Sequence, residues 1–164
     1  MGTGKSRFGL MLAGRLKMRF VDCDAYLEKQ EGRSILKIFE EDGEAYFRKL
    51  ESVVLKKVVK NKKVVLATGG GVVLLAQNRH WIKRNGFVVW LKSSPKKIFE
   101  RLKRGDDRPL LKVDDKMKEI VRLLNVREPL YKALADFTLS NRGRTIAPAV
   151  FRLMRVLKKK GVVA

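Results

Sequence analysis

The chain has 164 residues, of which 45% are hydrophobic, so it is long enough and apolar enough to form one domain with a buried core. It contains no run of about 18 apolar residues and no cleavable leader pattern, so neither a membrane span nor secretion is expected. The net charge of +21 favours anionic partners, whereas the single cysteine, Cys23, excludes an internal disulfide and is typical of a cytoplasmic protein.

Short apolar runs alternate with longer segments of helical periodicity along the whole chain. Strands are expected at 18–22, 63–68, 87–91 and 136–140. Helices are expected at 5–17, 35–39, 43–60, 77–84, 95–103, 116–133 and 147–159. This alternation predicts an α/β layered fold, with helices covering both faces of a parallel sheet. Ligands of such folds bind at the carboxyl ends of the strands, so the residues that follow each strand are candidate site residues.

The first candidate site is the opening sequence MGTGKSRFG. A phosphate-binding P-loop reads G-x-x-x-x-G-K-[ST] and lies between a strand and a helix. Gly4, Lys5 and Ser6 match its last three positions, and the helix expected at 5–17 follows them. The first glycine and the preceding strand have no counterpart in this sequence. Taken alone, the match is a weak sign of nucleotide binding.

Two carboxylates, Asp22 and Asp24, follow the first expected strand. Alternate residues of an extended segment point the same way, so both can face one spot while Cys23 turns away. Such a pair can hold Mg²⁺ or meet a substrate hydroxyl. The alternative is that Asp24 caps the helix that begins in AYLEKQ.

Three glycines, Gly69, Gly70 and Gly71, follow the second expected strand. They allow a positive φ, a close approach of backbone to a ligand, and donation by their N–H groups. The alternative is a tight turn from strand to helix. In the helix before that strand, Arg48 and Glu51 are three residues apart and share a face, so Glu51 can fix an arginine that binds a carboxylate.

The polar segment 103–115 is interrupted by glycine and proline, as a mobile lid would be. Arg108 lies at its centre and could reach a phosphoryl group during transfer. Arg127 is near the end of the next helix, and Arg142 and Arg144 follow the last strand.

Six of these motifs together resemble the shikimate kinase family, a branch of the nucleoside-monophosphate-kinase-like P-loop enzymes. In the family's order and spacing they are GTGKS, DCD, FRKLE, TGGG, DDRPLL and REPLY. The resemblance implies a three-layer α/β/α fold with a five-stranded parallel sheet of order 2-3-1-4-5. It implies a single domain over 1–164, with substrate-binding helices at about 24–60 and the lid at about 103–115. Its implied activity is ATP-dependent phosphorylation of the 3-hydroxyl of shikimate, on the route to aromatic amino acids, by a cytoplasmic monomer that uses Mg²⁺.

The resemblance also implies residue roles. The implied ATP-binding residues are Gly2, Thr3, Gly4, Lys5, Ser6, Arg7, Arg108 and Arg144, with Arg142 as a competitor of Arg144 at the adenine. The implied shikimate-binding residues are Asp24, Arg48, Gly69, Gly70, Gly71 and Arg127. Ser6 would bind Mg²⁺ directly and Asp22 through water. The catalytic residues would be Lys5, Asp24 and Arg108, which supply charge and a base or orienting group.

Three departures from the family pattern stand out: Arg7 replaces a usual Thr, the basic excess is large, and the first strand and P-loop glycine are lacking. We therefore expect an N-terminal truncation, a gap between the strands at 63–68 and 87–91, and poor folding or inactivity of 1–164 alone. The alternatives are another small-molecule kinase such as a gluconate kinase-like enzyme, a nucleic-acid-binding protein on a kinase scaffold, and an inactive paralogue or fragment.

Overall fold

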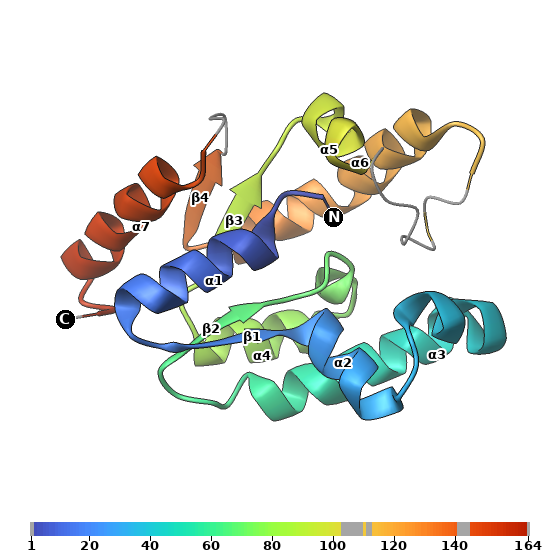
Figure 1. Ribbon diagram of the computed structural model, residues 1–164, viewed down its shortest axis with the longest axis horizontal. Helices are drawn as coiled ribbons and strands as arrows, with labels where there is room; N and C mark the ends of the chain where they lie inside the picture. The colour runs from blue at the N-terminus through green and yellow to red at the C-terminus, as the bar shows by residue number, and fades with distance from the viewer. Residues whose placement is uncertain (1, 103–109, 111–112, 141–144, 164) are drawn as a thin grey trace.

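Strands and helices alternate along the chain in the computed structural model, which describes residues 2–102, 110, 113–140 and 145–163 (Figure 1). The strands are β1 (Arg19–Asp22), β2 (Val64–Ala67), β3 (Val89–Lys92) and β4 (Phe137–Ser140). The α-helices are α1 (Lys5–Leu16), α2 (Cys23–Glu31), α3 (Ile35–Val58), α4 (Ala76–Asn85), α5 (Pro95–Leu102), α6 (Lys116–Leu134) and α7 (Ala147–Lys159), and η1 (Val72–Leu74) is a 3₁₀-helix. None of the described helices is long and apolar enough to cross a membrane.

The strands form two separate parallel pairs. β1 pairs with β2 from Arg19 opposite Val64 onward, and β3 pairs with β4 from Val89 opposite Phe137 onward. No strand among the described residues lies between β2 and β3, so the inner edge of each pair has no ladder partner there. The gap expected from the sequence at this position is confirmed.

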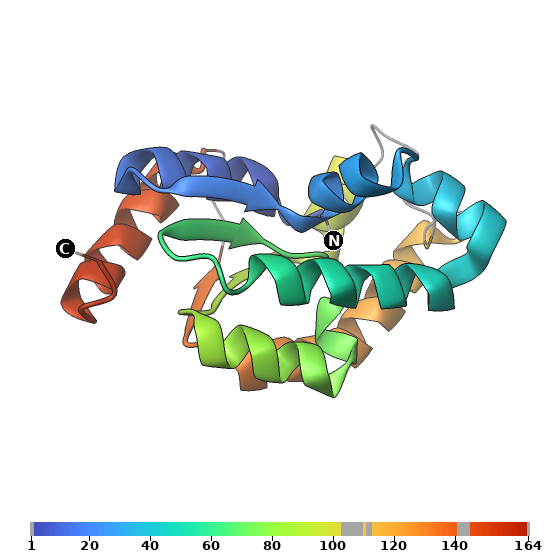
Figure 2. The same cartoon turned by 90° about the horizontal axis from the view of Figure 1, so that it is seen from below.

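Helices cover both faces of the strands, which confirms the predicted three-layer α/β/α arrangement. Figure 2 shows α1 on one side of β1 and β2, with α3 and α4 on the other. α1 lies so close to β1 that a Cβ on Gly9 would come within 2.6 Å of Cε2 of Phe20. α1 also packs on α7, where Val150, Leu153 and Leu157 lie on one face of the helix and are buried in one apolar cluster.

Local sequence signals account for several helix boundaries. The Ser34 side chain accepts a hydrogen bond from the Lys37 N–H at 3.2 Å and so caps the start of α3. The Asp115 side chain caps α6 in the same way. Helices expected at 35–39 and 43–60 are the two parts of α3, separated by a kink at Gly43, whose φ of 78° favours glycine.

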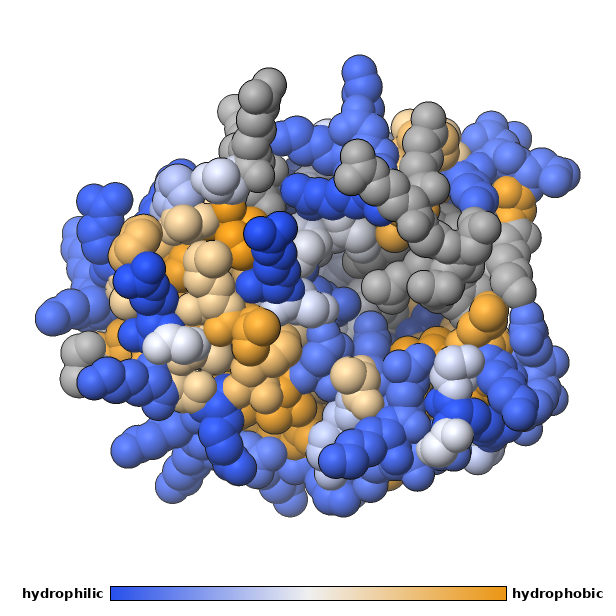
Figure 3. Space-filling model, viewed as in Figure 1, coloured by the Kyte–Doolittle hydropathy of each residue, from blue (hydrophilic) through white to orange (hydrophobic). Residues whose placement is uncertain are grey.

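A cavity of about 710 Å³ extends between β2 and β3 and continues toward the start of α1. For this reason Val64, Val65 and Leu66 are only half-buried, although their sequence is typical of a strand covered on every side. In Figure 3 the face seen from the same direction as Figure 1 is hollowed near its centre, and apolar side chains gather over α1 and α7.

Candidate active site

The site is built around the loop that leads into α1. Gly2 and Gly4 have φ values of 59° and 85°, a left-handed conformation that glycine adopts without a Cβ penalty. The Gly4 carbonyl accepts the first helical hydrogen bond, from Phe8 N–H at 3.0 Å. The N–H groups of the first helical turn have no acceptor within the helix, so the start of α1 is suited to bind an anion.

Arg101 on α5 holds this loop, and sequence reasoning did not single it out. Its Nη1 donates to the carbonyl oxygens of Gly2 at 3.2 Å and Thr3 at 2.9 Å, and to Oγ of Ser93 at 3.2 Å. Ser93 follows β3, so one side chain connects the loop to the carboxyl end of that strand. The sequence offered only a weak signal, a basic residue in the last turn of the helix before the expected lid.

The two aspartates meet the start of α1, as expected. Ser6 Oγ donates a hydrogen bond to Oδ2 of Asp22, and Lys5 Nζ lies 3.5 Å from Oδ2 of Asp24. The prediction that both aspartates lie on one extended segment was wrong in part, because Asp24 already lies in the first turn of α2. The alternative cap was also wrongly placed: Asp22 caps α2, and its Oδ1 accepts from Asp24 N–H at 3.0 Å.

Cys23 faces away from the site, as expected. It is 5% exposed and packs in the apolar cluster between α2 and α3. Burial, with the negative charges of Asp24 and Asp22, raises the pKa of its thiol to about 12. This cysteine is therefore a core residue.

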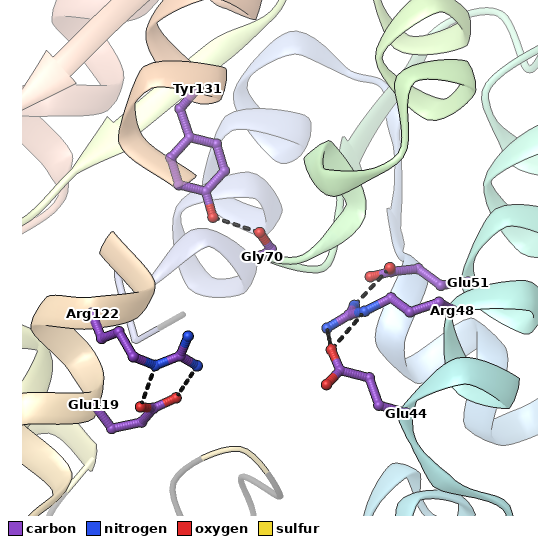
Figure 4. A network of polar contacts seen from close by, with 7 residues as sticks. All are labelled: Glu44, Arg48, Glu51, Gly70, Glu119, Arg122 and Tyr131. Atoms are coloured by element: carbon purple, nitrogen blue, oxygen red, sulfur yellow. Dashed lines mark hydrogen bonds and ion pairs between the residues drawn. The ribbon is translucent and has the colours of Figure 1, made fainter. Parts of the chain in front are cut away.

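Arg48 is held by two carboxylates of its own helix (Figure 4). Its Nη1 donates to Oε2 of Glu51 at 2.8 Å, while Nε and Nη2 donate to Oε1 of Glu44 at 3.1 and 2.9 Å. The pairing with Glu51 was expected from the three-residue spacing, whereas Glu44 was not singled out. Burial raises the pKa of Glu51, although the charge of Arg48 acts in the opposite direction. Arg48 is therefore fixed in place by a carboxylate that is itself buried.

The glycines after β2 are explained by close packing against this pair. A Cβ on Gly69 would lie 2.3 Å from Oε1 of Glu51, and one on Gly71 would lie 2.2 Å from Nη1 of Arg48. The expected positive φ is not found at either position; Gly71 has a φ of −88°. Close approach is thus the reason for glycine, and the groups that approach are the side chains of α3.

Arg127 on α6 is a buried cation beside Arg48. Its side chain is only 5% exposed, and its Nε has no hydrogen-bond partner among the described residues. Burial lowers the pKa of its guanidinium, and the positive charge of Arg48 lowers it further. One turn later, Tyr131 Oη donates to the Gly70 carbonyl at 2.5 Å, a contact that sequence reasoning missed. The guanidinium groups of Arg48 and Arg127 are thus near enough for their charges to interact, an arrangement suited to a carboxylate.

The sequence model of the shikimate kinase family matches residues 1–158. The chain belongs to the shikimate kinase family. A shikimate kinase of Caldanaerobacter subterraneus subsp. tengcongensis is 42% identical over 98% of this chain and 94% of its own length. The solved shikimate kinase from Acinetobacter baumannii in complex with shikimate is 38% identical, with a TM-score of 0.92 over 98% of this chain and 90% of its own.

A gluconokinase from Sinorhizobium meliloti 1021 is 14% identical, with a TM-score of 0.54 over 98% of this chain and 92% of its own, and so shares the fold alone. The comparisons thus favour a shikimate kinase over the gluconate kinase-like alternative. Arg108, Arg142 and Arg144 lie outside the described residues, so their roles at the lid and the adenine stay predictions. Arg7, where the family usually has Thr, is exposed on α1.

Proposed function

We propose that this chain transfers the γ-phosphoryl group of ATP to the 3-hydroxyl of shikimate and releases 3-phosphoshikimate and ADP. The observation that carries the proposal is the pair of half-buried Arg48 and buried Arg127, whose charges interact, near Asp24 and the start of α1. A small acid held by this pair has its ring next to a carboxylate and to a phosphate-binding helix terminus.

The shikimate carboxylate would lie between the two guanidinium groups. Arg127 supports this role because its buried Nε has no partner among the described residues. Glu44 and Glu51 orient Arg48 while neutralising part of its charge. The backbone at Gly69 and Gly71 lies against the side chains of Glu51 and Arg48. The Gly70 carbonyl accepts the hydrogen bond of Tyr131 and so connects this loop to α6.

The ATP phosphates would lie over the start of α1. The backbone from Gly2 to Arg7 would donate its N–H groups, and Lys5 would contact the β- and γ-phosphates. Ser6 and Asp22 supply a hydroxyl and a carboxylate, oxygen ligands that fit Mg²⁺ when phosphates and water complete its shell. No group of three or more acidic, His or Cys side chains in the described part of the chain could hold a metal alone. When bound, Mg²⁺ would neutralise charge on the phosphates.

Asp24 would receive the shikimate hydroxyl. Its carboxylate orients the hydroxyl toward the γ-phosphate and takes its proton as the new O–P bond forms and ADP leaves. The ammonium of Lys5, 3.5 Å from Asp24, keeps that carboxylate beside the transferred group. Arg108 would add positive charge from the lid. We further infer that the protein acts in the cytoplasm as a monomer, without nucleic acid.

The test is coupled ADP release with Mg²⁺ and ATP, with and without shikimate. We expect release to depend on shikimate and to fall in the Asp24→Asn variant, because the hydroxyl then lacks a proton acceptor. ADP release at the same rate with and without shikimate, in a folded sample, would contradict the proposal. Calorimetric titration with shikimate alone reports the carboxylate site separately from turnover.

A further inference from the structure

The basic charge of the chain is concentrated in its first and last segments. Residues 1–21 carry five Lys and Arg side chains and residues 137–164 carry seven, and neither segment contains Asp or Glu. These cations account for more than half of the net charge of +21. The helices of the two segments, α1 and α7, pack against each other, so their cations are gathered on one part of the surface (Figure 1). The proposed function uses only the start of α1 and leaves this charge unexplained.

Large apolar side chains are exposed among these cations. Leu10 on α1 is 60% exposed and Phe151 on α7 is 45% exposed. Each lies on the side of its helix opposite a buried residue, Leu12 and Leu153 respectively, and so faces away from the core. Figure 3 shows apolar side chains over α1 and α7 with hydrophilic side chains around them. We define the α1–α7 face by these two exposed apolar residues and the cations Arg15, Arg155 and Lys158.

The cations of the α1–α7 face are available to a partner. Arg155 and Lys158 follow Phe151 by four and seven residues, so they share its side of α7. Neither has an ion-pair partner among the residues that the structure describes. Arg15 lies over the Phe151 ring, with its Cζ 4.9 Å from the ring centroid, and so connects the two helices. Since α1 and α7 contain no carboxylate, nothing on these helices neutralises the charge.

This chemistry selects an anionic lipid surface as the partner. Lys and Arg around exposed Leu and Phe are the pattern with which proteins bind the interface of an anionic bilayer. A second copy of the chain would bring the same positive charge and be repelled. Nucleic acid would match the charge, but its phosphates offer no apolar contact to Leu10. One side of the Phe151 ring is also covered by Arg15, which makes it a poor platform for a base.

We propose that the α1–α7 face docks this chain on the surface of an anionic phospholipid bilayer. Leu10 and Phe151 enter the boundary between headgroups and acyl chains, while the three cations of the face contact lipid phosphates. Docking is peripheral, since none of the described helices could cross a membrane. In Figure 2 α3, which carries Arg48, lies on the other side of the strands, so docking leaves that helix exposed. The proposal goes beyond the proposed function, and its test needs neither ATP nor shikimate.

The test is co-sedimentation of the full 164-residue chain with lipid vesicles. One set consists of phosphatidylcholine alone, and the other contains about one-third phosphatidylglycerol. We expect binding only to the anionic vesicles, with a partition coefficient that falls about tenfold or more between about 0.1 and 0.5 M salt, because salt screens surface charges. Equal binding to both sets, or no binding to the anionic set, would overturn the proposal.

Two double variants with the same loss of charge locate the binding surface. Arg155→Gln with Lys158→Gln removes two cations from the α1–α7 face. Each cation near an anionic surface contributes about fivefold, so the partition coefficient should fall by about tenfold or more. Lys49→Gln with Arg84→Gln removes two exposed cations from α3 and α4, on the other side of the strands, and should lower it by less than about threefold. Equal effects of the two double variants would overturn the proposal.

A second pair of variants tests the apolar contact. Leu10→Ser should lower the partition coefficient by about fivefold or more, because the exposed leucine no longer leaves water. The control is Val53→Ser on α3, whose valine is 63% exposed and should not contact lipid. A polarity-sensitive dye on Leu10→Cys should shift to the blue on anionic vesicles, whereas the same dye on Val53→Cys should not; Cys23 is buried and stays unlabelled. Equal responses at the two positions would show that this face does not dock.

Other anionic partners are tested with random-sequence duplex DNA and with polyglutamate. We expect both to bind more weakly than the anionic vesicles at the same salt, because neither offers Leu10 and Phe151 an apolar environment. A chain that binds either polymer through Arg155 and Lys158, and does not bind the anionic vesicles, would have a different partner at this face. That result would overturn the proposal. All substituted side chains are exposed, so the variants should keep the fold, and circular dichroism checks this.

Discussion

Arg127 is the residue at which binding and stability are expected to respond in opposite directions. Arg127 is 5% exposed, and its Nε lacks a partner among the described residues. Burial and the charge of Arg48 lower the pKa of its guanidinium, although Tyr131 and the carboxylates of Glu44 and Glu51 act in the opposite direction. Such a group is costly in the free protein and becomes favourable only when an anion arrives. Replacing it should therefore weaken shikimate binding while making the empty protein more stable.

The expected loss of shikimate affinity can be given a magnitude. Losing one partner of a buried, hydrogen-bonded charge pair costs about 2–5 kcal/mol. In Arg127→Lys the charge stays but the planar fork is lost, so we expect the Kd for shikimate to rise by about 30-fold to 5,000-fold. Arg155→Lys, at an exposed position on α7, is the matched control and should change the Kd by less than about twofold.

The stability gain is measured without ligand. In Arg127→Met a side chain of similar length but no charge fills the site, and the free energy of unfolding in urea should rise by about 1–3 kcal/mol. Calorimetry gives the Kd and urea titration gives the stability of the same samples. An unchanged shikimate Kd in Arg127→Lys would refute the carboxylate assignment. A less stable Arg127→Met would show that the guanidinium is already satisfied in the free protein.

Three further outcomes are expected. Gly69→Ala should destabilise the chain by about 1–3 kcal/mol in urea unfolding, because its Cβ would lie 2.3 Å from Oε1 of Glu51. The control is Gly14→Ala, which has open space around it and should be neutral or stabilising. Equal effects of the two substitutions on the free energy of unfolding would argue against close packing at Gly69. Cys23 should react with iodoacetamide only after unfolding, because it is 5% exposed, and rapid labelling of native protein would show that α2 opens. Arg108→Ala should lower turnover and leave ATP affinity little changed in steady-state kinetics and nucleotide titration; loss of affinity alone would make Arg108 a binding residue.

The sequence was sufficient for the order and type of most elements, because apolar periodicity and turn residues are local signals. The resemblance to the family also located the break between β2 and β3, because the family's topology places the strand that precedes the P-loop there. The sequence did not predict the contacts of Arg101, Tyr131 and Glu44, which depend on how distant segments come together in space. Glycine at Gly69 and Gly71 was expected to allow a positive φ and a close approach to a ligand, but the groups that approach belong to a helix some twenty residues earlier in the chain.

The division of the sheet has a consequence for how the substrate acts on the fold. Arg48 belongs to α3, which packs with the β1–β2 pair through the cluster that includes Val21 and Leu66. Arg127 belongs to α6, whose Tyr131 ring lies 5.8 Å from that of Trp90 on β3. A single carboxylate bound by both arginines, as proposed, would therefore connect the two strand pairs. A change that moves the two pairs apart should then also weaken the binding of the acid.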